Sequence, residues 1–184
     1  MKNSFLILLL TLVVTGFYGC NGTGKTASGD SIATAASTKQ PIDTADARLA
    51  KDLSIFCNSQ VEAAKLAETK ASTQKVKNFA KQNEQLYTQL SNHLNQISES
   101  YNIKLPAEPS ATAQKNLQDL KEIKSSSFDH AYLLQMLKDH NATIREYNAA
   151  KNIQCIPLKM FVGSNQAAII KQAYAISDLK DKTP

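Results

Sequence analysis

Residues 74–102 read QKVKNFAKQNEQLYTQLSNHLNQISESYN, and the spacing of their apolar side chains decides the fold class. Apolar residues recur every three or four positions, which places them on one face of a helix at ~100° per residue. That face, which includes one polar asparagine, comprises Val76, Phe79, Ala80, Asn83, Leu86, Tyr87, Leu90, Leu94, Ile97 and Tyr101. Since a helix with one apolar face needs other helices against it, the stretch predicts a helical bundle.

The remainder of the chain contains the helices that such a bundle needs. Further long helices are expected over about 46–70, 126–150 and 157–180. The inward face of 46–70 is predicted to carry Leu53, Phe56, Cys57, Gln60, Ala64 and Ala67. That of 126–150 carries Tyr132, Leu133, Met136, Leu137, His140, Ile144 and Tyr147. That of 157–180 carries Leu158, Phe161, Val162, Ile169, Ala173, Ile176 and Leu179. Ser126 and Asp129 form a capping-box pattern where the third long helix begins. After residue 30 the only glycine is Gly163, which favours helices over a β-sandwich, so we expect an all-α four-helix bundle.

The connection over 103–127 is long enough, at ~25 residues, to run the full length of the bundle. It contains a short predicted helix over about 111–123. A long crossover of this kind between the second and third long helices is typical of ferritin-like folds. Counting ~1.5 Å of rise per residue, this topology brings four side chains within about 10 Å of one height. They are Glu62, Tyr87, His140 and Gln172.

Residues 1–20, MKNSFLILLLTLVVTGFYGC, predict a signal peptide rather than a part of the fold. Lys2 precedes an apolar run of about ten residues, which is too short for a bilayer core that needs ~20. The run ends in Gly19 and Cys20, a pattern that resembles a bacterial lipobox, in which the cysteine becomes the lipidated first residue. The alternative is a plain secretory signal with an incidental cysteine.

This pattern divides the chain into three parts. We expect a lipoprotein signal peptide over 1–19, a lipidated Cys20 with a flexible tether over 20–45, and the helical-bundle domain over 46–184. The tether is rich in Thr, Ser, Ala and Gly and therefore has too few large apolar side chains to form a core. No acidic run follows Cys20, so we expect an anchor in the cell envelope that faces the periplasm, on either the inner or the outer membrane.

Two ligand classes are not predicted. Residues 19–26, GCNGTGKT, match the phosphate-binding loop of nucleotide hydrolases, but no helical periodicity follows the Lys-Thr pair. The net charge of +5 is spread along the chain without a basic cluster, which does not suggest nucleic-acid binding. We therefore expect neither a nucleotide nor a nucleic acid as partner.

Several stretches of the sequence carry a family resemblance. They are VEAAKLAETKASTQKVKNFAKQ (61–82), YNIKLP (101–106) and FDHAYLLQMLKDH (128–140), followed by a final apolar helix. Together they resemble the bacterial domain-of-unknown-function family 4142, over about 50–178. The resemblance implies a secreted, often membrane-associated, ferritin-like helical bundle without an assigned activity.

The typical motifs of that family are only partly retained. The family's Asp-His pair in the second helix falls on Leu86 and Tyr87 here, and its Pro-x-x-x-x-His motif falls on Ala167 and Gln172. The histidine of the third helix is retained as His140, which makes His140 a weak candidate metal ligand. The alternative is a hydrogen-bonded core histidine. No Glu-x-x-His pair occurs, so a di-metal site of the ferritin type is not expected and no cofactor is predicted.

Cys57 and Cys155 would share an oxidising compartment, where a disulfide between them is permitted. In the crossover topology they lie about eight residue rises apart, or roughly 12 Å, whereas a disulfide tolerates about 7 Å between Cα atoms. We therefore expect two free, buried thiols that pack as small apolar groups.

No catalytic residues are predicted. The serines lack a Gly-x-Ser-x-Gly turn, and neither buried cysteine has a sequence context that would lower a thiol pKa. We therefore expect a non-catalytic envelope lipoprotein, held to the membrane through Cys20, that binds or supports a protein or small-molecule partner in the periplasm. The alternative is a ferritin-like metal or redox protein with a reduced metal site.

Overall fold

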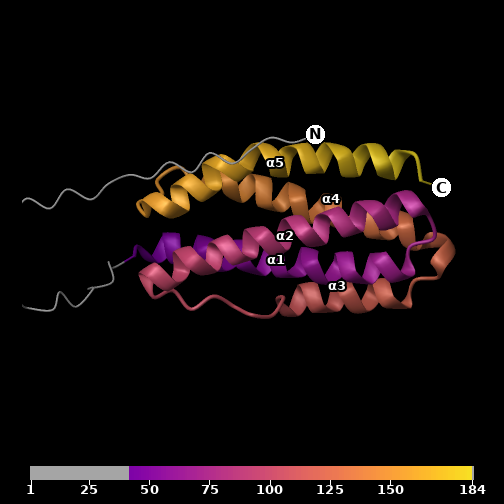
Figure 1. Cartoon of the computed structure of the whole chain (residues 1–184), viewed down its shortest axis with the longest axis horizontal. Helices are drawn as coiled ribbons and strands as arrows, with labels where there is room; N and C mark the ends of the chain where they lie inside the picture. The colour runs from indigo at the N-terminus through magenta and orange to yellow at the C-terminus, as the bar shows by residue number, and fades with distance from the viewer. Residues whose placement is uncertain (1–41, 184) are drawn as a thin grey trace, which may run out of the picture. The chain divides into compact units, whose positions relative to one another are not determined.

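The computed structural model describes residues 42–183, which contain five α-helices and no strand (Figure 1). The helices are α1 (Thr44–Lys70), α2 (Gln74–Tyr101), α3 (Ala111–Glu122), α4 (Ser125–Ala149) and α5 (Ile156–Asp181). Each begins and ends within two residues of its predicted bounds, and the all-α bundle is confirmed. The predicted signal peptide, Cys20 and nearly all of the tether lie outside the described residues.

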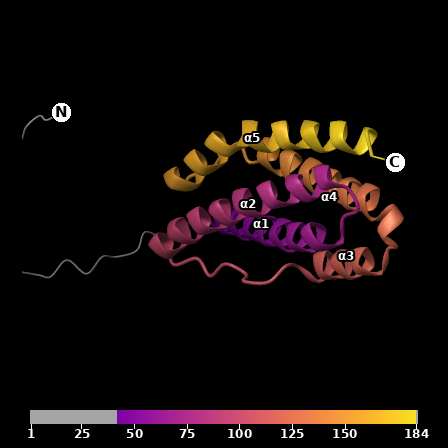
Figure 2. The same ribbon diagram turned by 45° about the vertical axis from the view of Figure 1, so that its right-hand side comes forward.

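The four long helices are connected by two short turns and one crossover (Figures 1 and 2). α1 and α2 run antiparallel, and α4 and α5 form a second antiparallel pair. Between the pairs, the segment that contains α3 runs back along the bundle, so α2 and α4 point in the same direction. The predicted long crossover with a short helix is therefore present.

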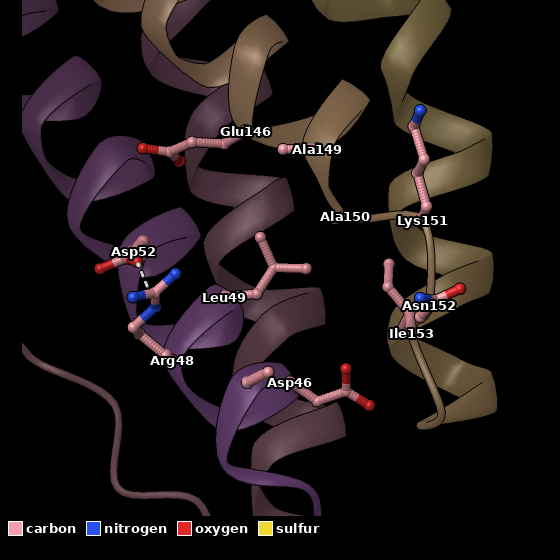
Figure 3. A pocket seen from close by; sticks show the side chains of 11 residues that line it. Asp46, Arg48, Leu49, Asp52, Glu146, Ala149, Ala150, Lys151, Asn152 and Ile153 are labelled. Carbon is pink, nitrogen blue, oxygen red and sulfur yellow. Dashed lines mark ion pairs between the residues drawn. The ribbon is translucent and has the colours of Figure 1, made fainter.

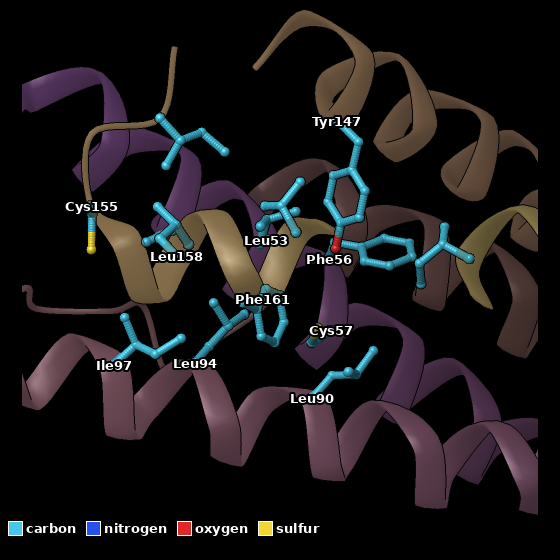
Figure 4. Close-up of a cluster of buried hydrophobic side chains, with 14 of the residues drawn as sticks. Leu53, Phe56, Cys57, Leu90, Leu94, Ile97, Tyr147, Cys155, Leu158 and Phe161 are labelled. Atoms are coloured by element: carbon cyan, nitrogen blue, oxygen red, sulfur yellow. The ribbon is translucent and has the colours of Figure 1, made fainter. Parts of the chain in front are cut away.

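The core consists of two clusters of buried side chains along the bundle axis. One cluster lies towards the start of α1 and includes Leu53, Phe56, Leu94, Leu158 and Phe161 (Figure 4). The other lies towards the end of α1 and includes Val76, Phe128, Tyr132, Leu133 and Ile176. Full burial of a large apolar side chain contributes roughly 1.5–3 kcal/mol, so these stripes supply the main driving force for folding. No helix within residues 42–183 is both long enough and apolar enough to cross a bilayer.

Asp129, the fifth residue of α4, binds the start of another helix. Its carboxylate is buried and accepts hydrogen bonds from the backbone N–H groups of Ser72 (2.7 Å) and Thr73 (2.9 Å), where α2 begins. The capping box predicted for Ser126 and Asp129 is therefore wrong. α4 starts one residue earlier than predicted, after Lys124, which makes no side-chain cap, and the carboxylate serves α2 instead.

Asp46 makes the corresponding contact at the other end of the bundle. It is buried in the first turn of α1, and one carboxylate oxygen accepts hydrogen bonds from the backbone N–H groups of Gln154 (2.9 Å) and Cys155 (2.6 Å). Cys155 is the N-cap of α5. The first four N–H groups of a helix have no partner within the helix and carry a partial positive charge, so a carboxylate there is stabilising.

We expect Asp129→Ala to lower the free energy of unfolding by about 2–3 kcal/mol, because two partly buried N–H groups would lose a charged acceptor. Burial opposes ionisation of Asp129, but the hydrogen bonds from Ser72 and Thr73 outweigh burial and lower the pKa of this carboxyl. Urea unfolding followed by circular dichroism measures the change. Asp119→Ala is the control, because Asp119 is exposed and pairs only with Lys115, and it should cost less than about 0.5 kcal/mol. Equal losses in both variants would contradict this role.

Candidate functional site

His140 lies fully buried in the middle of α4, and both of its ring nitrogens are engaged. Nδ1 donates to the backbone carbonyl of Met136 at 2.8 Å, which leaves Nε2 of the neutral ring to accept a hydrogen bond from the hydroxyl of Tyr87 on α2. The Phe56 ring packs edge-on against the imidazole, with 5.4 Å between the ring centroids. Burial lowers the pKa of His140 to about 4, against the opposing effect of the Met136 hydrogen bond. The imidazole is therefore neutral near pH 7.

A second polar contact lies directly beside this pair. The side-chain amide of Gln172 on α5 donates to Oδ1 of Asn83 on α2 at 2.6 Å, and Asn83 Nδ2 lies 3.7 Å from the sulfur of Met136. Because Met136 also contacts His140, the three long helices α2, α4 and α5 meet at one level, as the predicted heights required. Glu62 is exposed on the surface and does not take part in this layer; its carboxylate pairs with Lys65 at 2.9 Å.

The side chains at this level do not fit a metal ion. They supply one imidazole with both nitrogens occupied, a phenol, two amides and a thioether. Residues 42–183 contain no group of three or more His, Cys, Asp or Glu side chains that could hold a metal. His140 is therefore a hydrogen-bonded core residue in this structure, and the level is a packed polar layer.

Cys57 and Cys155 are both buried and both free in the structure. Cys57 lies on α1 beside Leu90, and Cys155 lies where α5 begins (Figure 4). Burial raises the pKa of the Cys57 thiol to about 12. Since the thiolate is the reactive form of cysteine, Cys57 is a poor nucleophile here.

The surface is hollowed where α1 meets α4, in two adjoining pockets. The first, here called the acidic pocket, has a volume of about 320 Å³ and lies between α1, α4 and the connection to α5 (Figure 3). Asp46, Asp52 and Glu146 line it, together with Arg48, whose side chain lies 4.0 Å from Asp52. Burial and the neighbouring Asp52 raise the pKa of Glu146.

The second pocket lies between α1, α4 and the start of α3, and is here called the crossover pocket. Its volume is about 300 Å³, and Asp52 and Glu146 line it as well. Its wall is mixed, with apolar and polar side chains from all three helices: Ile55, Phe56, Ser59, Gln60, Ser110, Thr112, Ala113, Asn116, Asp139, Ala142 and Thr143. An apolar floor with a few polar groups is typical of small-molecule sites.

Gln60 and Asp139 supply the most distinctive chemistry of the crossover pocket. The Gln60 side chain is 1% exposed, and its Nε2 donates to one Asp139 oxygen at 3.3 Å, while Gln135 donates to the other at 2.8 Å. Burial raises the pKa of Asp139, although these two amide hydrogen bonds oppose the shift. Gln60 Oε1 is buried without a hydrogen-bond partner among the described residues. One acceptor of the pocket is therefore left without a donor.

The sequence placed Gln60 on the inward stripe of the first helix but gave no role to Asp139. Asp139 belongs to the stretch 128–140, where it stands next to His140, and nothing in its spacing distinguishes it from a surface carboxylate. The partnership becomes visible only when α1 and α4 pack together.

Comparison with known proteins gives one match. A family described as a domain of unknown function (DUF4142) matches residues 31–179, which includes all five helices except the end of α5. No curated protein and no solved structure matches the chain.

We expect the fold to lose about 3 kcal/mol of stability as the pH falls from 6.5 to 4 through His140 alone. The unfolded imidazole has a pKa near 6.5 and the buried one about 4, so protons in this range bind the unfolded chain preferentially. Urea unfolding at pH 7.5 and pH 4.5 measures the loss. His140→Gln should be less stable at pH 7.5 but should lack this part of the pH dependence. An unchanged pH dependence in the variant would contradict the assignment.

Proposed function

The chain belongs to the DUF4142 family, and we propose that it is a membrane-anchored envelope lipoprotein whose helical bundle binds a ligand without catalysing a reaction. The chemistry at the centre of the described bundle supports binding rather than catalysis. His140 is neutral and enclosed there, and burial suppresses the ionisation of Cys57. The crossover pocket is the best-supported place for the ligand.

The proposed anchor is supported by the sequence alone. A short apolar run that ends in Gly19 and Cys20 is typical of a lipoprotein signal peptide. Two or more acyl chains on the cysteine suffice for stable membrane attachment. A plain secretory signal would leave Cys20 without lipid, so labelling with a fatty acid separates the two interpretations.

We expect Cys20→Ser to leave an unprocessed precursor that no longer incorporates labelled palmitate. The hydroxyl of serine cannot replace the thiol that receives the lipid. Cys57→Ser is the matched control, because it removes a buried thiol but keeps Cys20, and it should incorporate as much label as the unchanged chain. Equal palmitate incorporation in the Cys20→Ser chain would contradict the proposed anchor.

The observation that carries the binding proposal is the unpaired Oε1 of Gln60 beside Asp139. A buried acceptor without a donor costs about 1–3 kcal/mol, and Asp139 is a half-buried carboxylate whose pKa is raised by burial, so a nearby positive charge would stabilise its ionised form. A ligand with several N–H donors and a positive charge would satisfy both groups together. Glu146, at the border with the acidic pocket, adds to the attraction for a cation, whereas Asp52 there is paired with Arg48. We therefore propose a small organic cation of the amine or guanidine class.

We expect the mature chain to bind methylguanidinium more tightly than tetramethylammonium, which has the same charge but no N–H donor. Isothermal titration calorimetry at pH 7.5 measures both. Affinity should fall as the pH approaches the raised pKa of Asp139 from above, because protonation of the carboxyl removes the charge that the cation binds.

Asp139→Asn should weaken methylguanidinium binding at least tenfold, since the amide keeps the shape of the carboxyl but not its charge. Asp119→Asn, which removes an exposed carboxylate on α3, should leave the affinity unchanged. Equal binding of the two cations, or full affinity in Asp139→Asn, would exclude this ligand class for the crossover pocket.

A further inference from the structure

The last helix, α5, is apolar on two opposite faces. Its inward face is buried and includes Leu158, Phe161 and Ile169. At ~100° per residue, a second stripe lies on the opposite side of the helix and is exposed. This stripe, here called the α5 outer face, comprises Ile156, Met160, Gly163, Ala167 and Tyr174.

The exposure of the α5 outer face is unusual for this protein. Among the described residues, four large apolar side chains are exposed, and three of them lie on this face: Ile156 (69%), Met160 (68%) and Tyr174 (74%). Between these side chains Gly163 faces open space, since a Cβ atom there would meet no atom within 4 Å. Packing inside the bundle therefore does not explain the glycine. Exposed apolar patches of this kind mark contact surfaces.

The charges that flank the apolar part of the α5 outer face, from Ile156 to Tyr174, are positive. At ~100° per residue, Lys159 lies at one edge of the stripe and Lys171 at the other. No acidic residue occurs between Glu146 and Asp178, and Asp178, one turn after Tyr174 on the same face, pairs with Lys182 at 2.7 Å. An apolar stripe flanked by lysines is typical of helices that lie on anionic membranes, where the lysine stems extend along the apolar surface and the ammonium groups reach the headgroups.

The position of the α1 start connects this face with the proposed anchor. The tether from Cys20 enters the bundle at α1, whose first turn contains Asp46. Asp46 hydrogen-bonds the backbone N–H groups of Gln154 and Cys155, directly before α5. The tether therefore joins the bundle beside Ile156, at one end of the α5 outer face.

We propose that the α5 outer face lies on the surface of the bilayer, with Ile156, Met160 and Tyr174 in the interface and Lys159 and Lys171 against anionic headgroups. The inference rests on the proposed envelope location, but it concerns a membrane contact separate from the acyl chains on Cys20. The helix lies on the bilayer and does not cross it, because its opposite face is buried in the bundle.

A second copy of the chain is the competing occupant, and the charges disfavour the pairing that brings Gly163 and Ala167 of the two copies together. In an antiparallel pair centred between Gly163 and Ala167, Lys159 of one copy would lie opposite Lys171 of the other. The two carboxylates of α5, Asp178 and Asp181, lie beyond Tyr174 and would face neither lysine in this pairing. With an anionic lipid surface the same two lysines make favourable contacts with the headgroups, and each contributes roughly 1 kcal/mol to membrane binding.

Fluorescence tests the proposal directly, because the chain contains no tryptophan. Tyr174→Trp places a single reporter on the α5 outer face of the lipidated mature protein, reconstituted in vesicles of phosphatidylethanolamine and phosphatidylglycerol. Gln118→Trp is the matched control, since Gln118 is exposed on α3, which lies on the opposite side of the bundle from α5 (Figures 1 and 2). We expect brominated acyl chains to quench the fluorescence of the Tyr174→Trp variant at least threefold more strongly than that of Gln118→Trp.

Charge reversal provides the second measurement. Lys159→Glu combined with Lys171→Glu should reduce quenching of the tryptophan at position 174 severalfold in the same vesicles. With both lysines retained, vesicles of zwitterionic phosphatidylcholine should reduce this quenching by a similar factor. Equal quenching at positions 174 and 118 would overturn the proposal. A second pair of results would also overturn it: a molecular mass in solution that rises to that of a dimer as the protein concentration increases, and a blue-shifted emission of Tyr174→Trp without lipid. Together they would identify a second copy as the occupant.

The failure of this inference can be distinguished from the failure of the proposed anchor. If Cys20 carries palmitate but the reporter at position 174 is not quenched, the membrane contact of α5 is wrong and the anchor stands. If Cys20 carries no lipid, the mature Tyr174→Trp chain added to vesicles still reports on α5. Quenching that remains with the acyl-free chain supports the α5 contact without the anchor.

Discussion

The bundle depends on two buried aspartates that each bind the start of another helix. Asp129 of α4 accepts the free N–H groups before α2, and Asp46 of α1 accepts those before α5. Apolar stripes alone allow neighbouring helices to slide by a turn, because Leu and Ala contacts are not directional. A carboxylate that must meet two backbone donors is directional, so each contact fixes the height of one helix against another. The two contacts lie at opposite ends of the bundle and are compatible only with the long crossover, which starts α2 and α4 at the same end.

With the helix heights fixed in this way, the centre of the bundle forms a closed polar layer. His140, Tyr87, Asn83 and Gln172 satisfy one another across three helices. In a ferritin-like bundle this level can hold metal ligands, and here a phenol and two amides stand where a metal site would need carboxylates or imidazoles. The layer therefore contributes specificity of packing. A ligand from solvent can reach only the surface of the bundle, where α1, α4 and the start of α3 form the crossover pocket.

The sequence predicts the helices because their apolar periodicity is a local property, visible in any window around residues 74–102. It also predicts the level shared by Tyr87, His140 and Gln172, since heights follow from residue counts once the crossover is assumed. The roles of Asp46, Asp129 and Asp139 could not be predicted, because each carboxylate acts on a residue more than fifty positions away. Ser126 and Asp129 illustrate the difficulty: their spacing matches a capping box, but the Asp129 carboxylate binds the start of α2 instead.

Periodicity also fails to show the two apolar faces of α5, because a helix that is apolar on opposite sides has no single preferred direction. In the structure one face packs on the core and the other remains exposed, with the tether entering beside its first residues. A bilayer against this face would lie opposite α3, which borders the crossover pocket. The side of the pocket formed by the start of α3 would then lie away from the membrane, towards the aqueous compartment from which a small cation would arrive. The membrane contact and the ligand site are thus compatible in one orientation of the bundle, and the Asp46 contact keeps the start of α1, where the tether joins, beside the start of α5.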